Sequence, residues 1–273
     1  MFVALKKRSV LLISLLLFST AYGTWIDRME RKIYGVKPGV YIENQLVQGC
    51  LKREVEEVVD ELVVKHRRLP VNASLHRENG TILREVYGWE VDSGATVKTI
   101  IKAKENTRVK LVKKAVAPQH FALDLEPVTN TIGYYHTWFY GSWERYENIL
   151  QGLRSINNII IWPGQTFSFN DTVGPRTPER GYRMAPVIGG DGIGFGGGVC
   201  QVTTTLYNAA LQAKLKIIER NPHSISVPYI EPGKDATVVY GAQDLKLLNP
   251  YDHPVIIQAG VYRGKISVTI LGK

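Results

Sequence analysis

Cysteine is scarce in this chain of 273 residues, which contains only Cys50 and Cys200. A disulfide-rich scaffold is therefore excluded, because such scaffolds need several paired cysteines in a short chain. In an exported protein the two could in principle pair, but their surroundings argue against it. The segment Leu46–Cys50 superficially resembles a lipid-attachment sequence, yet it lies far beyond the apolar N-terminal run that such a signal requires. We expect Cys50 to be a small residue in front of a helix.

Long apolar runs are also missing beyond the N-terminus. Lys6, Lys7 and Arg8 precede a mostly apolar stretch over residues 10–22, and Ala21-Tyr22-Gly23 has the small-x-small form of a cleavage site. The stretch is shorter than the roughly 20 residues that cross a bilayer. Residues 1–23 are thus predicted to be an export signal, with a retained N-terminal anchor as the alternative. The remainder is expected to be extracytoplasmic: secreted, in the cell wall or on the outer face of the membrane.

Signatures of several function classes are absent. The sequence has no nucleotide-binding loop, haem motif, nucleic-acid fold signature or tight group of His, Cys and Asp with metal-ligand spacing. We therefore expect no cofactor, no metal and no nucleic-acid partner. Acidic residues are outnumbered, and the formal charge of +9 becomes +6 when the three cations of the signal are removed. This balance favours anionic wall polymers as partners, although a solvated basic surface would have the same composition.

The segment 24–117 is predicted to be a small α+β domain. Apolar residues at helical spacing indicate a helix over residues 51–66. A hairpin is expected around the Glu78-Asn79-Gly80 turn, a second helix with Ser93 as N-cap, and a strand over residues 108–116. Nothing in this domain suggests catalysis. Residues 118–129 mix prolines and acidic residues without clear periodicity and are predicted to be a linker.

Residues 130–273 are predicted to form a second α+β domain that ends in antiparallel strands. A helix is expected from Ser142, then a loop-rich stretch over 170–198 of the kind that often carries function. Strands are predicted at 225–229, 236–240, 245–248, 255–262 and 265–271. An aromatic cluster at the start of the domain fits either a sugar-binding groove or ordinary core packing; its members are Tyr134, Tyr135, Trp138, Phe139, Tyr140 and Trp143.

The segment from Gly196 to Leu211 carries the clearest chemical signal. Three glycines lead to Val199 and Cys200, and the apolar residues that follow have helical spacing, so Cys200 is expected at a helix N-terminus. The helix dipole and free N–H groups there favour the nucleophilic thiolate and could hold an oxyanion. Glycine also permits close approach of a substrate backbone. The alternative is a buried cysteine that packs beside a tight turn.

A cysteine nucleophile needs a base and a group that orients the base. Among six histidines, His223 is best placed, because one helix and a return to a strand would bring it back to Cys200. Asp235, at the start of the next predicted strand, is the candidate to orient the imidazole, with Asp244 as the substitute. A structural histidine and a turn-forming aspartate are the alternatives.

Several separated motifs in the second half strongly resemble the VanW family. They are Thr166-Phe167-Ser168-Phe169-Asn170, Val173-Gly174-Pro175-Arg176, Gly181-Tyr182, Ala185-Pro186, Gly197-Gly198-Val199-Cys200-Gln201, Pro222-His223-Ser224, Asp235-Ala236-Thr237-Val238 and Tyr240-Gly241. The resemblance covers about residues 130–273. The preceding segment, with Pro70-Val71-Asn72-Ala73 and Gly88-Trp89-Glu90-Val91-Asp92, is more loosely similar to the peptidoglycan-binding domain that often precedes VanW domains.

This resemblance implies a bacterial cell-wall protein from a family named for its occurrence in vancomycin-resistance clusters. Some members are regarded as L,D-transpeptidases, and the family cysteine aligns with Cys200. By that resemblance Cys200 would attack the carbonyl of an L,D bond in a peptidoglycan stem peptide, expel D-Ala and pass the acyl group to an amine of a second stem. One departure is the run Thr203-Thr204-Thr205, where the family commonly has a serine. The expected substrate contacts are Gly197, Gly198, Gln201, Thr204, Arg176 and Tyr182.

Three functions therefore compete. The first is acyl transfer on peptidoglycan by Cys200, His223 and Asp235. The second is hydrolysis, because the order of a cysteine before a helix and a histidine before a strand is also similar to papain-like wall endopeptidases. The third is a non-catalytic wall-binding or glycopeptide-resistance accessory protein in which Cys200 only packs the glycine loop.

Overall fold

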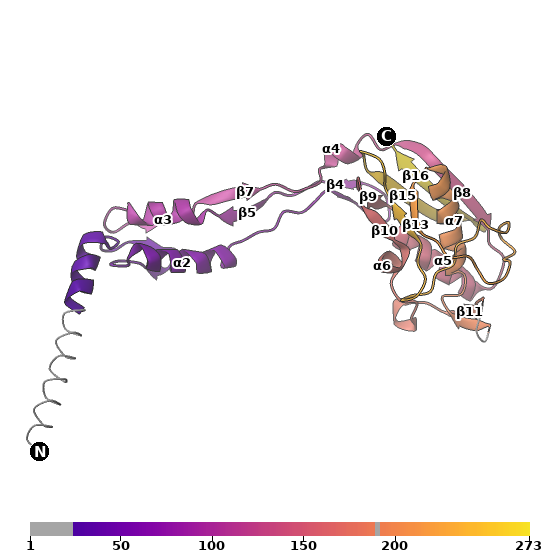
Figure 1. Cartoon of the computed structure of the whole chain (residues 1–273), viewed down its shortest axis with the longest axis horizontal. Coiled ribbons are helices and arrows are strands. Elements are labelled where there is room, and N and C mark those ends of the chain that lie inside the picture. Colours follow the sequence, from indigo (N-terminus) through magenta and orange to yellow (C-terminus); the bar gives the residue numbers. More distant parts are fainter. Residues whose placement is uncertain (1–23, 189–191) are drawn as a thin grey trace, which may run out of the picture. The chain divides into compact units, whose positions relative to one another are not determined.

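The computed structural model describes residues 24–188 and 192–273, which form two compact units (Figure 1). Unit 1 contains the described residues up to 71 together with 86–118, and unit 2 contains 72–85 and 119–273. Both units combine helices with mainly antiparallel strands, so the α+β fold class is confirmed. The predicted export signal, residues 1–23, lies outside the described residues. Within 24–188 and 192–273, no helix has the length and apolar character needed to cross a bilayer.

In unit 1 the helices α2 (Lys52–Lys65) and α3 (Ser93–Ile101) pack against each other. Residues 24–34 are also helical. The N-cap of α3 is Asp92 instead of the predicted Ser93, because the Asp92 carboxylate accepts from the Ala95 amide at 2.9 Å. Short strands complete the unit: β1 (Tyr41–Ile42), β2 (Gln45–Leu46) and β6 (Arg108–Val109) form one sheet, and β5 (Gly88–Val91) pairs with β7 (Lys113–Val116). Cys50 precedes α2 as expected.

The turn of the predicted hairpin and residues 119–129 of the predicted linker belong to unit 2. Strands β3 (Ser74–Leu75) and β4 (Ile82–Leu83) pair around the predicted turn. The segment predicted as a linker over 118–129 instead contains the helix α4 (Ala122–Leu125). Buried side chains from both segments share one cluster with Ile256 of the central sheet; they are Ala73, Leu75, Ala122, Leu125 and Val128. The sequence predicts the hairpin but not the surface against which it packs. The predicted boundary at 117 therefore assigns the hairpin to the first domain, whereas it packs in unit 2.

The centre of unit 2 is a four-stranded antiparallel sheet in the order β8-β16-β15-β9, with α5 and α7 packed against one face (Figure 1). The bounds are β8 Asn130–Trp138, α5 Trp143–Ile156, β9 Ile159–Ile161, α7 Val199–Gln212, β15 Val255–Tyr262 and β16 Lys265–Gly272. Strand β16 alternates buried and half-buried residues, which is typical of a strand with one face in the core. The N-cap of α5 is Ser142, as predicted.

Helix α7 lies unusually close to β8 because of one glycine. A Cβ on Gly133 would stand 2.3 Å from the Ala209 carbonyl oxygen and 2.8 Å from the Ala213 side chain. Both atoms belong to α7 or its C-cap, so only glycine permits this approach. The distance between the sheet and α7, the helix that contains Cys200, therefore depends on Gly133.

Smaller elements surround this core. A second sheet has the order β10-β14-β13, and β11 pairs with β12. The bounds are β10 Thr166–Ser168, α6 Phe169–Val173, β11 Met184–Pro186, β12 Ile193–Phe195, β13 Lys216–Glu219 and β14 Lys246–Leu248, with a 3-10 turn at Pro178–Arg180. The strands predicted at 225–229 and 236–240 do not form; their region is irregular, with isolated bridges at Thr237 and Val239. Hydrogen bonds to α7 hold part of this region in place of a sheet.

Candidate active site

Cys200 lies in the first turn of α7, as predicted, and the three preceding glycines fix the entry to that turn. Gly196 and Gly198 have positive φ values of 82° and 108°, a region that side chains disfavour. A Cβ on Gly196 would meet the stem of Arg176 at 2.7 Å, and a Cβ on Gly198 would meet the stem of Arg145 at 3.0 Å. The glycines thus make room for two arginine side chains.

The buried side chain of Asn148, on α5, holds the glycine loop. Its amide group donates to the carbonyl oxygens of Gly197 and Arg183, and its own oxygen accepts from the Arg183 amide. All three distances lie between 2.8 and 3.0 Å. Residues on both sides of the β11–β12 hairpin are thereby tied to one side chain, which stabilises the approach of the chain to Cys200.

Polar residues on α7 bind the irregular segment 234–238. Thr204 exchanges hydrogen bonds with the Ala236 backbone, Thr203 donates to the Ala236 carbonyl, and Asn208 donates to the Lys234 carbonyl. Ala236 is completely buried, so these bonds satisfy backbone groups that water cannot reach. They place Asp235 and Thr237 next to the N-terminal turn of the same helix.

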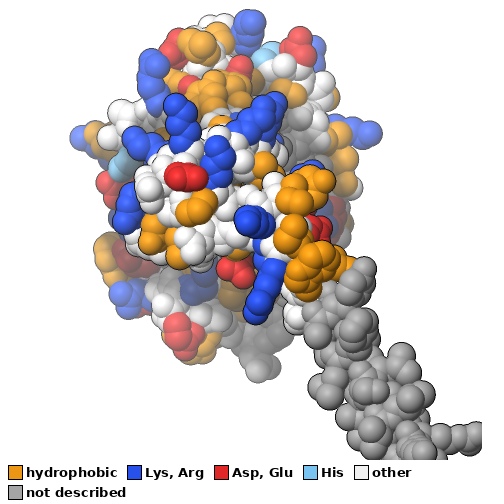
Figure 2. Space-filling model, turned by 90° about the vertical axis from the view of Figure 1, so that its left-hand side faces the viewer, with side chains coloured by type: hydrophobic (Ala, Val, Ile, Leu, Met, Phe, Trp, Pro, Cys, Tyr) orange, Lys and Arg blue, Asp and Glu red, His pale blue; other side chains and the backbone are white. Residues whose placement is uncertain are grey.

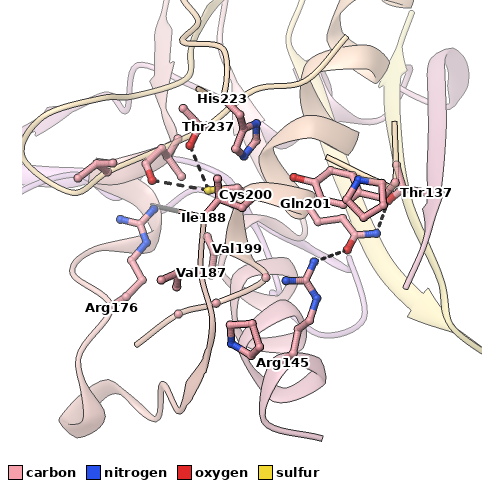
Figure 3. Close-up of a pocket in the computed structure, with 18 of the residues that line it drawn as sticks. Thr137, Arg145, Arg176, Val187, Ile188, Val199, Cys200, Gln201, His223 and Thr237 are labelled. Carbon is pink, nitrogen blue, oxygen red and sulfur yellow. Dashed lines mark hydrogen bonds between the residues drawn. The ribbon is translucent and has the colours of Figure 1, made fainter. Parts of the chain in front are cut away.

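The Cys200 sulfur points into this segment. Sγ lies 3.4 Å from the Thr237 hydroxyl and 3.7 Å from the Val238 carbonyl oxygen (Figure 3). The imidazole of His223 lies on the same side of Cys200 in the close-up. Thiol, hydroxyl and imidazole therefore meet at one point, although they come from three separate parts of the sequence.

His223 is held by Asp235. The Asp235 carboxylate accepts from both the backbone amide of His223, at 2.6 Å, and Nδ1, at 2.7 Å. Because a carboxylate only accepts, Nδ1 carries the proton, and Nε2 is left for the site. Nε2 is buried and has no hydrogen bond of good geometry to any described residue. On its other side Asp235 is fixed by Arg220, which donates to Oδ1 at 2.9 Å and to the backbone oxygen at 2.7 Å.

The protonation equilibria of these groups follow from their contacts. Burial alone would raise the pKa of Cys200, but His223 and Thr237 more than offset it, and the pKa is lowered from its ordinary value. Burial alone would lower the pKa of His223, whereas Cys200 and Asp235 reverse that effect and raise it. Both shifts favour a thiolate beside an imidazolium. The pKa of Asp235 is lowered despite burial, because His223 and Arg220 stabilise the carboxylate.

Cys200 and His223 open onto a cavity of about 890 Å³, a size that suits a small-molecule or peptide substrate. Trp138 and Tyr140 line it, while Tyr135 and Phe139 pack against the core, so the aromatic cluster is divided between the cavity wall and the core. Figure 3 shows Arg176 and Arg145 on different sides of Cys200.

Four of the six predicted substrate contacts line this cavity: Gly197, Gly198, Gln201 and Arg176. Thr204 and Tyr182 do not. Thr204 is fully buried and bonded to Ala236, and Tyr182 lies in the hydrophobic core with 3% of its surface exposed. The substitute Asp244 does not orient His223, because its carboxylate accepts from Ser168 and from the amides of Asn170 and Leu245.

Sequence reasoning missed four residues of the site: Arg145, Asn148, Arg220 and Thr237. Arg145 and Asn148 lie on α5, far from Cys200 in the chain, and their polar character on a helix is unremarkable by itself. Thr237 stands inside one of the family-like motifs and could have been noticed there. Arg220 directly precedes Asn221-Pro222-His223, but nothing in the sequence indicates that it binds Asp235.

The fold and the site together define an α+β protein with a thiol, an imidazole and a carboxylate in series at the wall of a large cavity. Residues 144–271 match the family described as VanW like protein. The chain is 35% identical to the uncharacterized protein YoaR of Bacillus subtilis (strain 168). The aligned region of 219 residues covers 78% of this chain and 72% of YoaR. The chain belongs to the VanW family.

A second relative is similar over a shorter region. The chain is 31% identical to the vancomycin B-type resistance protein VanW of Enterococcus faecalis (strain ATCC 700802 / V583). The aligned region of 113 residues covers 38% of this chain and 41% of that protein. No solved structure matches the chain significantly.

Proposed function

We propose that this protein is an extracytoplasmic L,D-transpeptidase that cross-links peptidoglycan through an acyl-enzyme on Cys200. One observation carries the proposal: a cysteine with a lowered pKa stands in the first turn of a helix, in a large cavity, beside a histidine that is oriented by a buried carboxylate. A cysteine that only packs a loop needs none of these features. Each of them is a feature that activates a nucleophile or gives it access to a substrate.

The geometry supports a two-step reaction. The Cys200 thiolate attacks the carbonyl carbon of the L,D peptide bond, and His223 Nε2 gives its proton to the departing amine of D-Ala as the C–N bond breaks. A thioester between Cys200 and the stem peptide results. The amine of a second stem then attacks the thioester, Nε2 takes its proton, and the thiolate leaves. The new peptide bond is the cross-link.

The N-terminal turn of α7 supports the negative charge that develops on the carbonyl oxygen. The amide of Gln201 donates to the Gly198 carbonyl, whereas the amide of Cys200 has no acceptor among the described residues. Free amides at a helix N-terminus stabilise an oxyanion through hydrogen bonds and the helix dipole. We assign that role to the Cys200 amide.

The test is mass spectrometry of the chain from Thr24, as wild type and Cys200→Ala, after incubation with peptidoglycan tetrapeptide. A Cys200-dependent adduct at the mass of the stem minus D-Ala is expected, followed by a cross-linked dimer. Shortened stems without a dimer would indicate hydrolysis, because water would then accept the acyl group. Wall binding with neither adduct nor product would show that the chain is a binding module instead.

Unit 1 has a segment rich in exposed cations. Between Lys98 and Lys114 there are seven Lys and Arg side chains, all exposed, and Glu105 is the one acidic residue. Figure 2 faces unit 1 and shows Lys and Arg side chains spread over its surface. We propose that this surface binds anionic wall polymers while unit 2 acts on stem peptides. Sedimentation with cell walls should then weaken as salt is raised, because salt screens exposed charges.

A further inference from the structure

Two arginines line the cavity beside Cys200. They are Arg145 and Arg176, and in the part of the chain that the structure describes no Asp or Glu joins them in the lining. Within residues 24–188 and 192–273, neither arginine forms a salt bridge with a carboxylate. Partly buried cations normally have an anionic partner, because removing a charge from water is costly. The Cys200 thiolate favours the charged form of both arginines, and a carboxylate of the substrate would supply a second anionic partner.

Arg176 has a donor that the protein itself leaves unused. Its Nη1 donates to the Asn170 side-chain oxygen at 2.7 Å and to the Gly174 carbonyl at 3.0 Å, both uncharged acceptors. Its Nη2 is buried and has no partner among the described residues. The nearby carboxylate of Asp244 is already bound to Ser168 and Asn170. The guanidinium group is therefore held at one end and free at the other.

Arg145 is fixed in a similar way. Its Nη2 donates at 2.9 Å to the side-chain oxygen of Gln201, whose amide group is anchored by the Trp138 carbonyl and the Thr137 hydroxyl. Gln201 is 1% exposed, so its hydrogen bonds are used within the protein. Gln201 is thus a positioning residue for Arg145. Together with the glycines that accommodate the arginine stems, these bonds place both guanidinium groups before any substrate binds.

We propose that Arg176, supported by Arg145, binds the free C-terminal carboxylate of the donor peptide. This inference rests on the proposed acyl transfer and specifies its substrate class: a peptide whose cleaved bond is the last one, so that the leaving amino acid carries the carboxylate. A guanidinium group matches a carboxylate with two parallel hydrogen bonds. A peptide that continues beyond the leaving residue has no charge at that position and would leave Nη2 unpaired.

Binding to the Cys200→Ala variant tests this inference without requiring turnover. The probes are peptidoglycan tetrapeptide with a free terminal carboxylate and the same peptide with only that carboxylate converted to an amide. Isothermal titration calorimetry is expected to show tighter binding of the acid by about tenfold or more. Equal affinity for acid and amide would overturn the inference, and this comparison needs no arginine variant to fold.

Arginine variants in the Cys200→Ala background identify the residue responsible. Arg176→Gln is expected to remove the preference for the acid, and Arg176→Lys to retain part of it. Arg183→Gln is the matched control, since Arg183 is exposed and does not line the cavity; it should leave the preference intact. If Arg176→Gln keeps the full preference, Arg176 is not the receptor.

The two proposals can fail separately. A wild-type adduct that forms equally well from acid and amide would sustain acyl transfer and reject carboxylate recognition. A preference for the acid without any adduct would sustain recognition of the carboxylate and reject the transpeptidase.

Discussion

The two cysteines of this chain lie in opposite electrostatic environments. Burial raises the pKa of Cys50, and the neighbouring Glu54 raises it further. The pKa of Cys200 is lowered instead, since His223 and Thr237 outweigh the effect of its burial. Neither cysteine is in a disulfide. Each therefore serves as the reference for the other in one experiment.

The first prediction concerns thiol reactivity as a function of pH. The thiolate is the reactive form, so as the pH is raised, iodoacetamide should modify Cys200 before Cys50. His223→Ala should move the Cys200 profile to higher pH and leave that of Cys50 unchanged. Peptide mapping after brief alkylation measures both sites. If Cys200 reacts only at the pH where ordinary thiols do, or if His223→Ala has no effect, the imidazole does not activate the thiol.

The grouping of Cys200, His223 and Asp235 could be predicted from the sequence, because the helix that follows Cys200 constrains their spacing. One helix and its return bring His223 back toward Cys200, and the next turn delivers Asp235. Arg145 and Asn148 could not be predicted, because their roles depend on how α5 packs against the glycine loop. The bonds of Thr204 to the buried Ala236 backbone could not be predicted either, because the sequence does not tell which side chains of α7 meet a buried backbone segment.

At the scale of elements, the position of α7 on the sheet depends on Gly133. Sequence patterns predicted α7, α5 and the β15–β16 hairpin, since each has a clear apolar period. The strands predicted at 225–229 and 236–240 do not form. At the start of the second one, hydroxyl and amide groups of α7 take the backbone hydrogen bonds that a neighbouring strand would otherwise supply. A propensity for strands is visible in sequence, but the available partner is not.

The second prediction compares two glycines in contact with α7. Gly133→Ala should destabilise the protein by about 1–3 kcal/mol, because the new methyl group meets the helix backbone. Gly152→Ala is the matched control: its Cβ would lie 3.5 Å from the Val202 side chain, an ordinary contact, within a helix that favours alanine. Urea unfolding measures both. Equal effects of the two substitutions would contradict the close approach of α7 to β8.

At the scale of the whole molecule, the hairpin 72–85 is a part of unit 2 that precedes much of unit 1 in the chain. Asn158 donates to the carbonyls of His76 and Arg77, and Glu85 accepts from the Ala122 amide. Leu75 and Ala73 join the cluster that covers Ile256 on the sheet. These contacts predict that unit 2 is incomplete without the hairpin.

The third prediction follows from this arrangement. Two fragments are compared: the first is 119–273, and the second joins 72–85 to 119–273 through a short Gly/Ser linker in place of residues 86–118. The free energy of unfolding in urea should be lower for the first fragment by about 2 kcal/mol or more. The first fragment exposes the apolar side chains that Leu75 covers. Both fragments contain the whole segment that matches the family, so their difference isolates the hairpin. Equal unfolding midpoints would show that the hairpin adds nothing.

The path of the chain also has an evolutionary consequence. The polypeptide passes between the units three times, after residues 71, 85 and 118. A single crossover between two homologous genes, wherever it falls, would leave at least one unit built from segments of both parents. Unlike domains joined end to end, these two units cannot be exchanged by one recombination event, so their sequences are expected to have diverged together.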